Sequence, residues 1–237
     1  MTQPCAVVTG GARNIGQAIA LRLQEDGYRV IVLDIVAPEC ETLRGDAVRI
    51  DLADIDCATD ATERIAREHP VNVLVNNVGI VKPATLEDVQ LADFDRLMHL
   101  NVRTALICAK AFVPSMRREG WGRIVTNTSR VTRGKTRRTL YSGTKGALQA
   151  MSRTWALELA PDGITVNCVA PGPIATTAFW QNNDPDADYT RALMDDIPVG
   201  RMGQPDDVSN AVSFFCDRRA GFVTGQTLFV CGGVTVG

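Results

Sequence analysis

Short apolar runs alternate with longer amphipathic stretches along most of the chain. The apolar runs predict strands at residues 5–8, 28–33, 47–50, 71–75, 122–126, 164–169 and 227–230. The amphipathic stretches predict helices at residues 15–26, 54–69, 91–119, 140–160 and 205–216. The strands are apolar at almost every position, as expected when both faces of a sheet are covered. We therefore predict an α/β fold, a doubly wound parallel sheet of about seven strands with helices on both faces.

One segment interrupts this alternation. Residues 176–196 are polar and acidic, and they fit neither a buried strand nor a core helix. The segment follows a predicted strand, so it is expected near the ligand-binding edge of the sheet, and we interpret it as a substrate lid. The remaining sequence contains no linker or repeat, and 237 residues then predict a single domain, residues 1–237.

Composition narrows the range of partners. A net charge of -2 gives no general affinity for nucleic acid or for an anionic membrane. No apolar run approaches the length of a membrane span, and the first residues do not resemble a signal peptide. Seven cysteines without a CxxC pair, together with two histidines, His69 and His99, predict no metal site. We expect free thiols in a reducing compartment, and hence a cytoplasmic protein.

A glycine-rich turn lies between the first predicted strand and the first predicted helix. Residues 9–16 of this turn read TGGARNIG. Such a turn lets backbone N–H groups at a helix N-terminus approach the pyrophosphate of a dinucleotide. A glycine cluster before a helix can also be only a tight turn. The candidate cofactor-binding residues here are Gly10, Arg13, Asn14, Ile15 and Gly16.

An acidic residue ends the second predicted strand and bears on the choice of cofactor. Asp34 can accept hydrogen bonds from a ribose 2′-hydroxyl and repels a 2′-phosphate, which favours NAD over NADP. Arg13 argues the other way, because a guanidinium in the turn can reach a 2′-phosphate. We give Asp34 more weight, since it stands at the ribose position and Ile35, not a basic residue, follows it. The alternative is that Asp34 only caps the strand.

Tyr141 and Lys145 are four residues apart at the start of the helix predicted over 140–160, so they share one face. Tyrosine, with a pKa near 10, is a poor base at neutral pH, and a nearby ammonium lowers that pKa. The pair can therefore exchange a proton with a substrate while a hydride moves to or from a nicotinamide. Taken alone, this spacing more often marks an ordinary surface pair.

Two further polar residues are placed to support this chemistry. Ser129 follows the strand predicted over 122–126, at the sheet edge where ligands bind, and its hydroxyl can contact a substrate oxygen. Thr126 and Thr128 are alternatives for that role. Asn101 lies inside a predicted helix, where asparagine is mildly unfavourable, so it either binds a water or bonds back to its own helix.

Taken in order, these motifs resemble the short-chain dehydrogenase/reductase family, in its single-domain form with a Rossmann-type sheet, over nearly the whole chain. The residues that carry the resemblance are Thr9, Gly10 and Gly16 of a TGxxxGxG motif, Asp51 and Leu52, Asn76 to Gly79 of an NNAG motif, the tetrad Asn101, Ser129, Tyr141 and Lys145, Pro171, Gly172 and Thr176 of a PGxxxT motif, Phe222 to Gln226, and Gly232 with Gly233.

The chain departs from the family pattern at four points. Asn14 replaces the middle glycine of the turn; asparagine tolerates a positive φ, so the turn is expected to survive. Val78 replaces an alanine, and Cys231 replaces the aspartate before the final glycine pair. The Ser129–Tyr141 spacing is one residue shorter than common, which implies a tighter loop between them.

The resemblance implies a role for each tetrad residue. Tyr141 is the general acid/base, Lys145 lowers its pKa and holds the nicotinamide ribose, Ser129 polarises the substrate oxygen, and Asn101 holds a proton-relaying water. The resemblance also implies a homotetramer or homodimer that pairs the helices predicted over 91–119 and 140–160. The further cofactor-binding residues it implies are Asp51, Leu52, Asn77, Gly79, Tyr141, Lys145, Pro171, Gly172, Ile174 and Thr176.

The loop between Ser129 and Tyr141 is strongly basic in an otherwise slightly acidic chain. It carries five cations over residues 130–140, and we single out Arg137 and Arg138 as a clamp for an anionic substrate. The alternative is a solvated or subunit-interface loop. Phe179 and Trp180 in the lid are candidates for an apolar wall of the substrate site, or they only pack the lid on the core.

The function predicted from the sequence is an NAD-dependent oxidoreductase acting on a secondary alcohol or ketone, with an anionic substrate as a hypothesis. An NADP-dependent 3-oxoacyl or ketone reductase is the alternative, if Arg13 outweighs Asp34. A dinucleotide-binding regulator without catalytic activity is a more remote alternative, which the intact tetrad disfavours.

Overall fold

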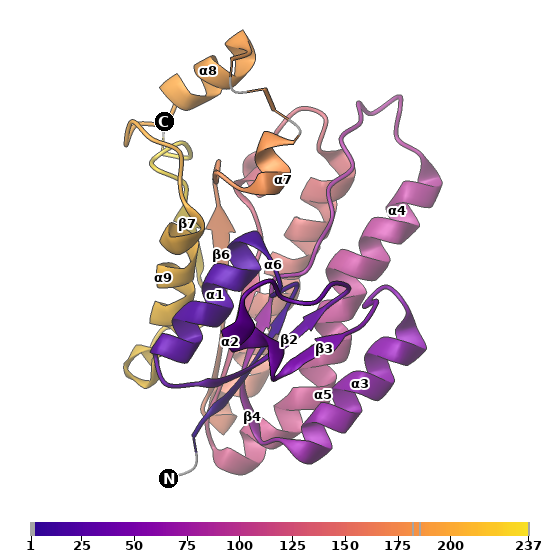
Figure 1. Ribbon diagram of the computed structural model, residues 1–237, viewed down its shortest axis with the longest axis vertical. Helices are drawn as coiled ribbons and strands as arrows, with labels where there is room; N and C mark the ends of the chain where they lie inside the picture. Colours follow the sequence, from indigo (N-terminus) through magenta and orange to yellow (C-terminus); the bar gives the residue numbers. More distant parts are fainter. Residues whose placement is uncertain (1–2, 182, 185, 237) are drawn as a thin grey trace.

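A single sheet of seven parallel strands forms the centre of the computed structural model, which describes residues 3–181, 183–184 and 186–236 (Figure 1). The strands are β1 (Cys5–Thr9), β2 (Arg29–Asp34), β3 (Ala47–Arg49), β4 (Val71–Asn76), β5 (Gly122–Asn127), β6 (Ile164–Pro171) and β7 (Thr227–Val230). Their order in the sheet is β3-β2-β1-β4-β5-β6-β7, and each neighbouring pair is parallel. The predicted doubly wound parallel sheet is confirmed.

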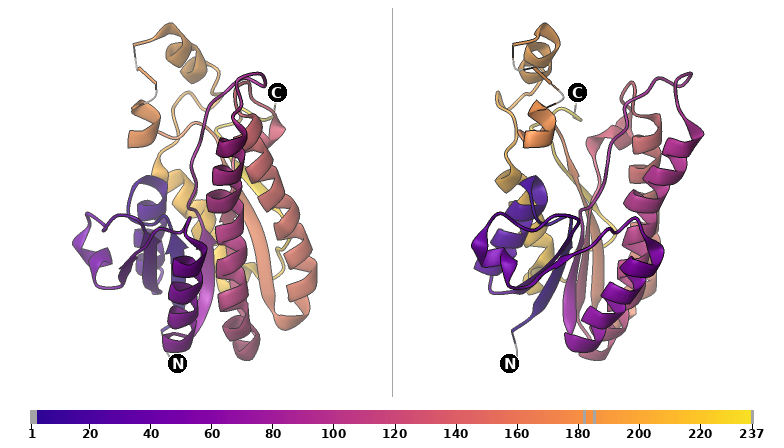
Figure 2. Two further views of the ribbon diagram at one scale, coloured as in Figure 1. Left: turned by 90° about the vertical axis from the view of Figure 1, so that its right-hand side faces the viewer. Right: turned by 45° about the vertical axis from the view of Figure 1, so that its right-hand side comes forward.

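Helices cover both faces of the sheet, so the molecule has three layers (Figure 2). The longer helices are α1 (Asn14–Glu25), α3 (Ile55–Glu68), α5 (Thr104–Glu119), α6 (Thr139–Leu159) and α9 (Pro205–Cys216). One face packs against α1 and α9, and the other against α3, α5 and α6. The described helices include none long and apolar enough to span a membrane.

Alternate side chains of the strands supply the two cores. In β1, Ala6 and Val8 pack on the side of α1 and α9, whereas Cys5 and Val7 pack on the side of α3 and α5. All four are almost completely buried. A strand buried on both faces can contain apolar residues at every position, which explains why these strands are apolar runs rather than alternating ones.

The parallel arrangement brings the carboxyl ends of all strands to one edge of the sheet. The chain winds outward in one direction from β1 to β3 and in the other from β4 to β7, so the direction reverses between β1 and β4. Ligands of such sheets bind in the crevice outside this reversal point. The glycine turn follows β1, and the residues after β4, β5 and β6 complete this edge, at the top in Figure 1.

Element boundaries agree with the predictions to within about two residues except in three places. The helix predicted over 91–119 consists of α4 (Leu91–Leu97), a π-helical stretch (Met98–Arg103) and α5. A short helix, α2 (Glu41–Arg44), precedes β3. The predicted lid contains two helices, α7 (Thr177–Trp180) and α8 (Asp188–Asp195), which lie above the carboxyl ends of the strands (Figure 1).

Candidate active site

The turn after β1 is shaped to bring backbone close to a ligand. Gly10 has a φ of +62°, and Asn14 has a φ of +50°, so both lie in the left-handed region. A side chain at Gly16 would overlap the carbonyl oxygen of Gly10, which leaves room only for glycine. The Asn77 side chain donates to the carbonyl oxygens of Thr9 (3.1 Å) and Gly10 (2.9 Å). Asn77 thereby fixes the turn to the end of β4.

The N-terminus of α1 fits the diphosphate of a dinucleotide. Arg13 is its N-cap residue, and its side chain makes no capping hydrogen bond, so the N–H groups of the first turn are left for another acceptor. The helix dipole adds a partial positive charge at the same place. Together with the overlap that excludes a side chain at Gly16, this arrangement is a cradle of backbone that suits a phosphate group.

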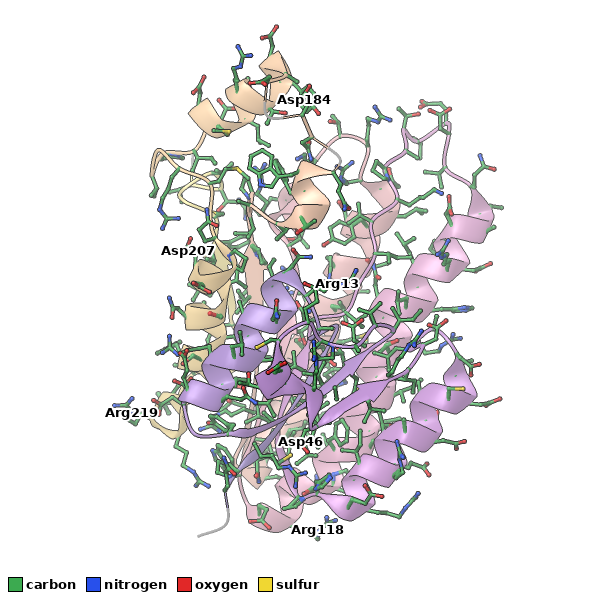
Figure 3. All side chains as sticks on the ribbon, in the orientation of Figure 1. Arg13, Asp46, Arg118, Asp184, Asp207 and Arg219 are labelled. Atoms are coloured by element: carbon green, nitrogen blue, oxygen red, sulfur yellow. The ribbon has the colours of Figure 1, made fainter. Side chains whose placement is uncertain are left out.

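Asp34 is fixed where the adenosine ribose of a dinucleotide is expected. Its Oδ2 accepts a hydrogen bond from the Ala12 N–H at 3.0 Å, and its Oδ1 accepts one from the Val36 N–H at 3.2 Å. Arg13 lies beside the upper end of α1 and below α7 (Figure 3), and its guanidinium is 3.9 Å from the Glu39 carboxylate. The one cation of the turn therefore lies near an acid, Glu39.

Tyr141 lies near the start of α6 at the carboxyl edge of the sheet. Burial raises the pKa of Tyr141 to about 12, and two groups oppose this rise: a hydrogen bond with the Ser129 side chain and the charge of Arg138. The sequence prediction assigned the lowering of this pKa to Lys145. Instead, the groups that lower the pKa of Tyr141 in this structure are Ser129 and Arg138. The Lys145 Nζ lies 5.5 Å from the centre of the Tyr141 ring.

Lys145 is a buried amine held by a backbone carbonyl. Its Nζ donates to the carbonyl oxygen of Asn127, the last residue of β5, at 2.7 Å. Burial lowers the pKa of Lys145 to about 8. The amine is thus close to the point at which it exchanges a proton at neutral pH, which suits a group that passes protons to or from its neighbours.

Asn101 links three segments of the chain and does not bond back to its own helix. Its Oδ1 accepts from the Ile80 N–H at 2.9 Å, and its Nδ2 donates to the Ile80 carbonyl at 3.0 Å and to the Thr144 Oγ1 at 3.1 Å. It lies in the π-helical stretch, and such π turns are frequent at functional sites. These tertiary bonds replace the local bond that was the alternative prediction.

Gly79 separates Asn101 from Lys145. A Cβ on Gly79 would lie 3.3 Å from the Asn101 Oδ1 and 3.5 Å from the Lys145 Nζ. The absence of a side chain therefore keeps open the space between the amide and the amine. Thr144 and Asn127 belong to this arrangement but were not singled out from the sequence; Thr144 lies between Tyr141 and Lys145 in the same motif, which is the signal that marks it.

A cavity of about 550 Å³ opens beside Tyr141 and Ser129. Pro171, Gly172, Ile174 and Thr176, which follow or end β6, line it, as do Ile15 and Gly79. Thr176 also caps α7, because its Oγ1 accepts from the Phe179 N–H at 3.1 Å. These six predicted cofactor-binding residues therefore line one cavity. Asn14 lies beside them, because its side chain accepts a hydrogen bond from the first residue of α7.

The predicted substrate residues divide between the cavity and the solvent. Arg138 and Phe179 line the cavity, whereas Arg137 is exposed and does not, which corrects the prediction for Arg137. Trp180 packs edge-on against Phe179, with ring centres 4.9 Å apart, and does not itself line the cavity. Two cations that the sequence prediction passed over, Arg130 and Lys135, line the cavity with Arg138.

Two predicted cofactor residues lie after β3. Asp51 is exposed, and its Oδ1 accepts from the Ala53 N–H at 2.9 Å. The Leu52 side chain is buried in the core between the sheet and α3, and its carbonyl accepts from the Thr104 Oγ1 at 3.0 Å. Leu52 therefore presents backbone rather than side chain to this edge. Among the residues that the structure describes, no three His, Cys, Asp or Glu side chains are grouped to hold a metal.

These features define a class of protein: an oxidoreductase that acts on carbonyl or CH–OH groups with a nicotinamide cofactor. A family model described as enoyl-(acyl carrier protein) reductase matches residues 10–235. The chain belongs to the short-chain dehydrogenase/reductase family, as its motifs predicted.

Relatives span nearly the whole chain. The (2S)-[(R)-hydroxy(phenyl)methyl]succinyl-CoA dehydrogenase subunit BbsD of Thauera aromatica is 36% identical, over 96% of this chain and 95% of its own. The 3-oxoacyl-[acyl-carrier-protein] reductase FabG of Staphylococcus epidermidis is 33% identical, over 97% and 98%. A Beutenbergia cavernae protein assigned as an NAD(P)-dependent gluconate 5-dehydrogenase, solved with NADP at low occupancy, is 31% identical with a TM-score of 0.90, over 99% and 97%.

Proposed function

We propose that the protein is an NAD-dependent oxidoreductase that interconverts a secondary alcohol and a ketone, with Tyr141 as the general acid/base. The observation that carries this proposal is that Tyr141 and Ser129 line one cavity, with the Lys145 amine 5.5 Å from the centre of the tyrosine ring. Two hydroxyls that line the same cavity can bind a single substrate oxygen between them.

The residues supply the proton chemistry and the orientation. When bound, the nicotinamide supplies the hydride acceptor or donor. In the oxidative direction the alcohol carbon gives up a hydride with its electron pair, and the hydroxyl proton passes to the Tyr141 phenolate, so that a ketone forms. Ser129 donates to the substrate oxygen and fixes its position. Lys145, with its pKa near 8, can pass the proton on toward the space between Gly79 and Asn101.

The choice of NAD rests on Asp34. Its carboxylate is fixed by two backbone N–H groups at the end of β2, where it favours a ribose hydroxyl and repels a 2′-phosphate. The NADP bound to the Beutenbergia cavernae relative supports the alternative, an NADP-dependent 3-oxoacyl or ketone reductase, and so does Arg13. We weigh the fixed carboxylate above Arg13, because Glu39 already attracts that guanidinium.

Initial rates with NAD and NADP, followed by absorbance of the reduced nicotinamide over a panel of alcohols, test the proposal. We expect turnover with NAD at least about tenfold more efficient than with NADP, because like charges brought together cost several kcal/mol. Tyr141→Phe should abolish turnover and leave NAD binding intact. Tight NAD binding with no turnover of any alcohol or ketone would instead favour the non-catalytic regulator.

The names of two relatives support an anionic substrate. The Thauera aromatica relative is named for a succinyl-CoA derivative, and the Beutenbergia cavernae relative for gluconate. Gluconate is a carboxylate, and a succinyl thioester keeps one free carboxylate. The 176–196 segment, whose α7 carries Phe179 into the cavity wall, suits the role of a lid over such a substrate.

We further propose a homotetramer or homodimer formed by pairing of α5 and α6. Leu106 on α5 is 40% exposed and Leu157 on α6 is 81% exposed, and large exposed apolar side chains on long helices support a subunit interface. Buried free thiols such as Cys108 and Cys216 support a reducing, cytoplasmic setting. Light scattering on the purified protein measures the oligomeric state, and charged substitutions at Leu157 should lower it.

A further inference from the structure

Three cations of the loop after β5 line the same cavity as Tyr141 and Ser129. We call Arg130, Lys135 and Arg138 the cation cluster. Arg130 and Arg138 are half-buried, and Lys135 is exposed but lines the rim of the cavity. The other two cations of this loop, at positions 133 and 137, are exposed and do not line the cavity. The basic loop is therefore divided into a solvated part and a part that faces the substrate space.

The cluster has no counter-charge within the described part of the chain. The described residues that line the cavity include no aspartate or glutamate. No described carboxylate lies within 4.0 Å of a cluster cation either. Partial burial lowers the pKa of Lys135, and the charges of Arg130 and Arg138 lower it further. Gathering three unpaired cations in a protein of net charge -2 is unfavourable unless an anion joins them.

The backbone fixes the loop in this conformation. Gly134 has a φ of +100° and Arg137 a φ of +59°, so the chain turns sharply at both positions. The carbonyl oxygen of Arg137 accepts from the Ala84 N–H at 3.2 Å and from the Arg138 Nη1 at 3.0 Å. These bonds tie the loop to the segment before α4 and hold the Arg138 guanidinium, so Arg138 is positioned in advance of binding.

The rest of the cavity is apolar, and one cation lies close to the reacting group. Ile80, Val81, Phe179 and Leu193 line the cavity with the cluster, so it suits a ligand with both an apolar part and a charged group. Arg138 precedes Tyr141 by three residues at the start of α6, and its charge lowers the pKa of Tyr141. An anion on Arg138 would therefore lie near the oxygen that Tyr141 contacts.

We propose that the cation cluster binds a carboxylate of the substrate, so that the enzyme acts on hydroxy acids and oxo acids that carry an apolar chain. A guanidinium matches a carboxylate with two parallel hydrogen bonds, and Lys135 adds a third charge at the rim. This inference rests on the proposed function, which supplies the reaction, whereas the cluster selects the substrate.

Binding can be measured without turnover. Titration calorimetry of the full-length protein saturated with NAD compares sodium hexanoate with neutral hexanamide, which has the same chain. We expect hexanoate to bind about tenfold or more tightly, as for hydrogen bonds to charged groups. Arg138→Gln, Arg130→Gln and Lys135→Gln should each lose most of this preference. The matched control Arg133→Gln, an exposed cation of the same loop, should retain it. Equal binding of the two probes, or a preference that survives Arg130→Gln with Arg138→Gln, would overturn the proposal.

Turnover measurements distinguish a failure of the proposed carboxylate site from a failure of the proposed oxidoreductase reaction. The unmodified enzyme is assayed with 3-hydroxyhexanoate and with its methyl ester, and we expect the acid to show the higher kcat/KM through a lower KM. If the ester is oxidised as efficiently, the reaction stands and the carboxylate site is wrong. If hexanoate binding depends on the cluster but neither compound nor any hydroxy acid in a panel is turned over, the carboxylate site stands and the proposed reaction is wrong.

Discussion

The Asn14 side chain connects the glycine turn to the start of α7. Its Oδ1 accepts a hydrogen bond from the Thr177 N–H at 3.0 Å, across 163 positions of sequence. Asn14 has a φ of +50°, where the family motif has glycine, so this residue accepts a left-handed backbone and adds a side chain that glycine lacks. The cofactor-binding turn and the lid are therefore joined by a bond that the family's usual residue cannot make.

Replacing Asn14 by glycine should loosen the lid without harming the turn. Glycine adopts a positive φ freely, so the Asn14→Gly protein is expected to fold with little change in stability. The Thr177 amide should exchange with solvent faster, and the KM for substrate should rise by about two- to tenfold, the range expected for one neutral hydrogen bond. Hydrogen exchange of the α7 amides and steady-state kinetics measure the two effects. Asn14→Asp keeps the acceptor and serves as the control; unchanged Thr177 exchange in Asn14→Gly would contradict the link.

Adding a methyl group at Gly79 should impair catalysis more than folding. The Cβ would lie 3.3 Å from the Asn101 Oδ1, closer than most Cβ contacts, and 3.5 Å from the Lys145 Nζ. We expect kcat for Gly79→Ala to fall about tenfold or more, within the range of a disturbed proton transfer. In Gly143→Ala, where nothing lies within 4 Å of the added Cβ, kcat should be unchanged and the protein more stable by roughly 0.5–1 kcal/mol. Equal kcat values for the two variants would show that the space at Gly79 is not used.

The strands and most helices were predictable from the sequence, because apolar runs and helical periodicity follow directly from which faces are buried. The π-helical stretch was not predictable. The Asn101 side chain within it bonds to Ile80 and Thr144, 21 and 43 positions away, and no local pattern reports such contacts. The lid helices were also missed, because an acidic segment with a narrow apolar face resembles a loop in composition.

The candidate site could be predicted wherever a residue type carried the chemistry, as for Tyr141 and Lys145. It could not be predicted where the side-chain direction depends on backbone torsions. Arg137 and Arg138 are equivalent in sequence, yet the φ of +59° at Arg137 leaves that side chain in solvent, while Arg138 faces the cavity. The effect of burial on the Tyr141 pKa likewise depends on packing that no local pattern reports.

Removing the Ser129 hydroxyl should shift the pH dependence of alcohol oxidation upward. The pKa of Tyr141 is raised to about 12 by burial, even with the Ser129 side chain and the charge of Arg138 lowering it, so Ser129→Ala is expected to raise that pKa further. Oxidation requires the phenolate, and the acid limb of the kcat/KM profile should therefore move to higher pH. The measurement is kcat/KM for one alcohol between pH 6 and pH 10. An acid limb at the same pH in Ser129→Ala would mean that another group limits the reaction.

Neutralising Asp34 should relax the preference for NAD. Asp34→Asn keeps an oxygen that can accept from the Ala12 N–H and removes the charge that opposes a 2′-phosphate. We expect the ratio of kcat/KM for NADP to that for NAD to rise about tenfold or more, since like-charge contacts cost several kcal/mol. Glu39→Gln, which frees Arg13 from an exposed pairing, should raise the ratio less. A ratio unchanged by Asp34→Asn would mean that other residues determine the cofactor preference.

Lys145 should reduce stability while it serves catalysis. Burial lowers its pKa from about 10.5 to about 8, so the unfolded chain holds this proton more tightly than the folded protein does. Above pH 10.5 both states carry a neutral amine, so the buried lysine does not lower the free energy of unfolding. Between pH 10.5 and pH 8 this loss of free energy of unfolding grows as the pH falls. Below pH 8 the loss is constant. The pKa shift corresponds to a loss of at most about 3 kcal/mol in the free energy of unfolding. A variant that lacks the amine regains this free energy, but it also loses the hydrogen bond to Asn127, which offsets part of the gain.

Lys145→Met should therefore unfold at higher denaturant concentration than the unmodified protein at pH 7, and the difference should shrink by pH 10. Turnover should fall at least about a hundredfold over the same range, because the proton-transfer group is lost. Denaturant unfolding at pH 7 and pH 10, with activity measured on the same samples, tests both effects. Lys110→Met, at an exposed lysine of α5, is the control and should leave the pH dependence of stability unchanged. A Lys145→Met protein that is less stable at pH 7 would mean that the amine's hydrogen bond outweighs the cost of burying its charge.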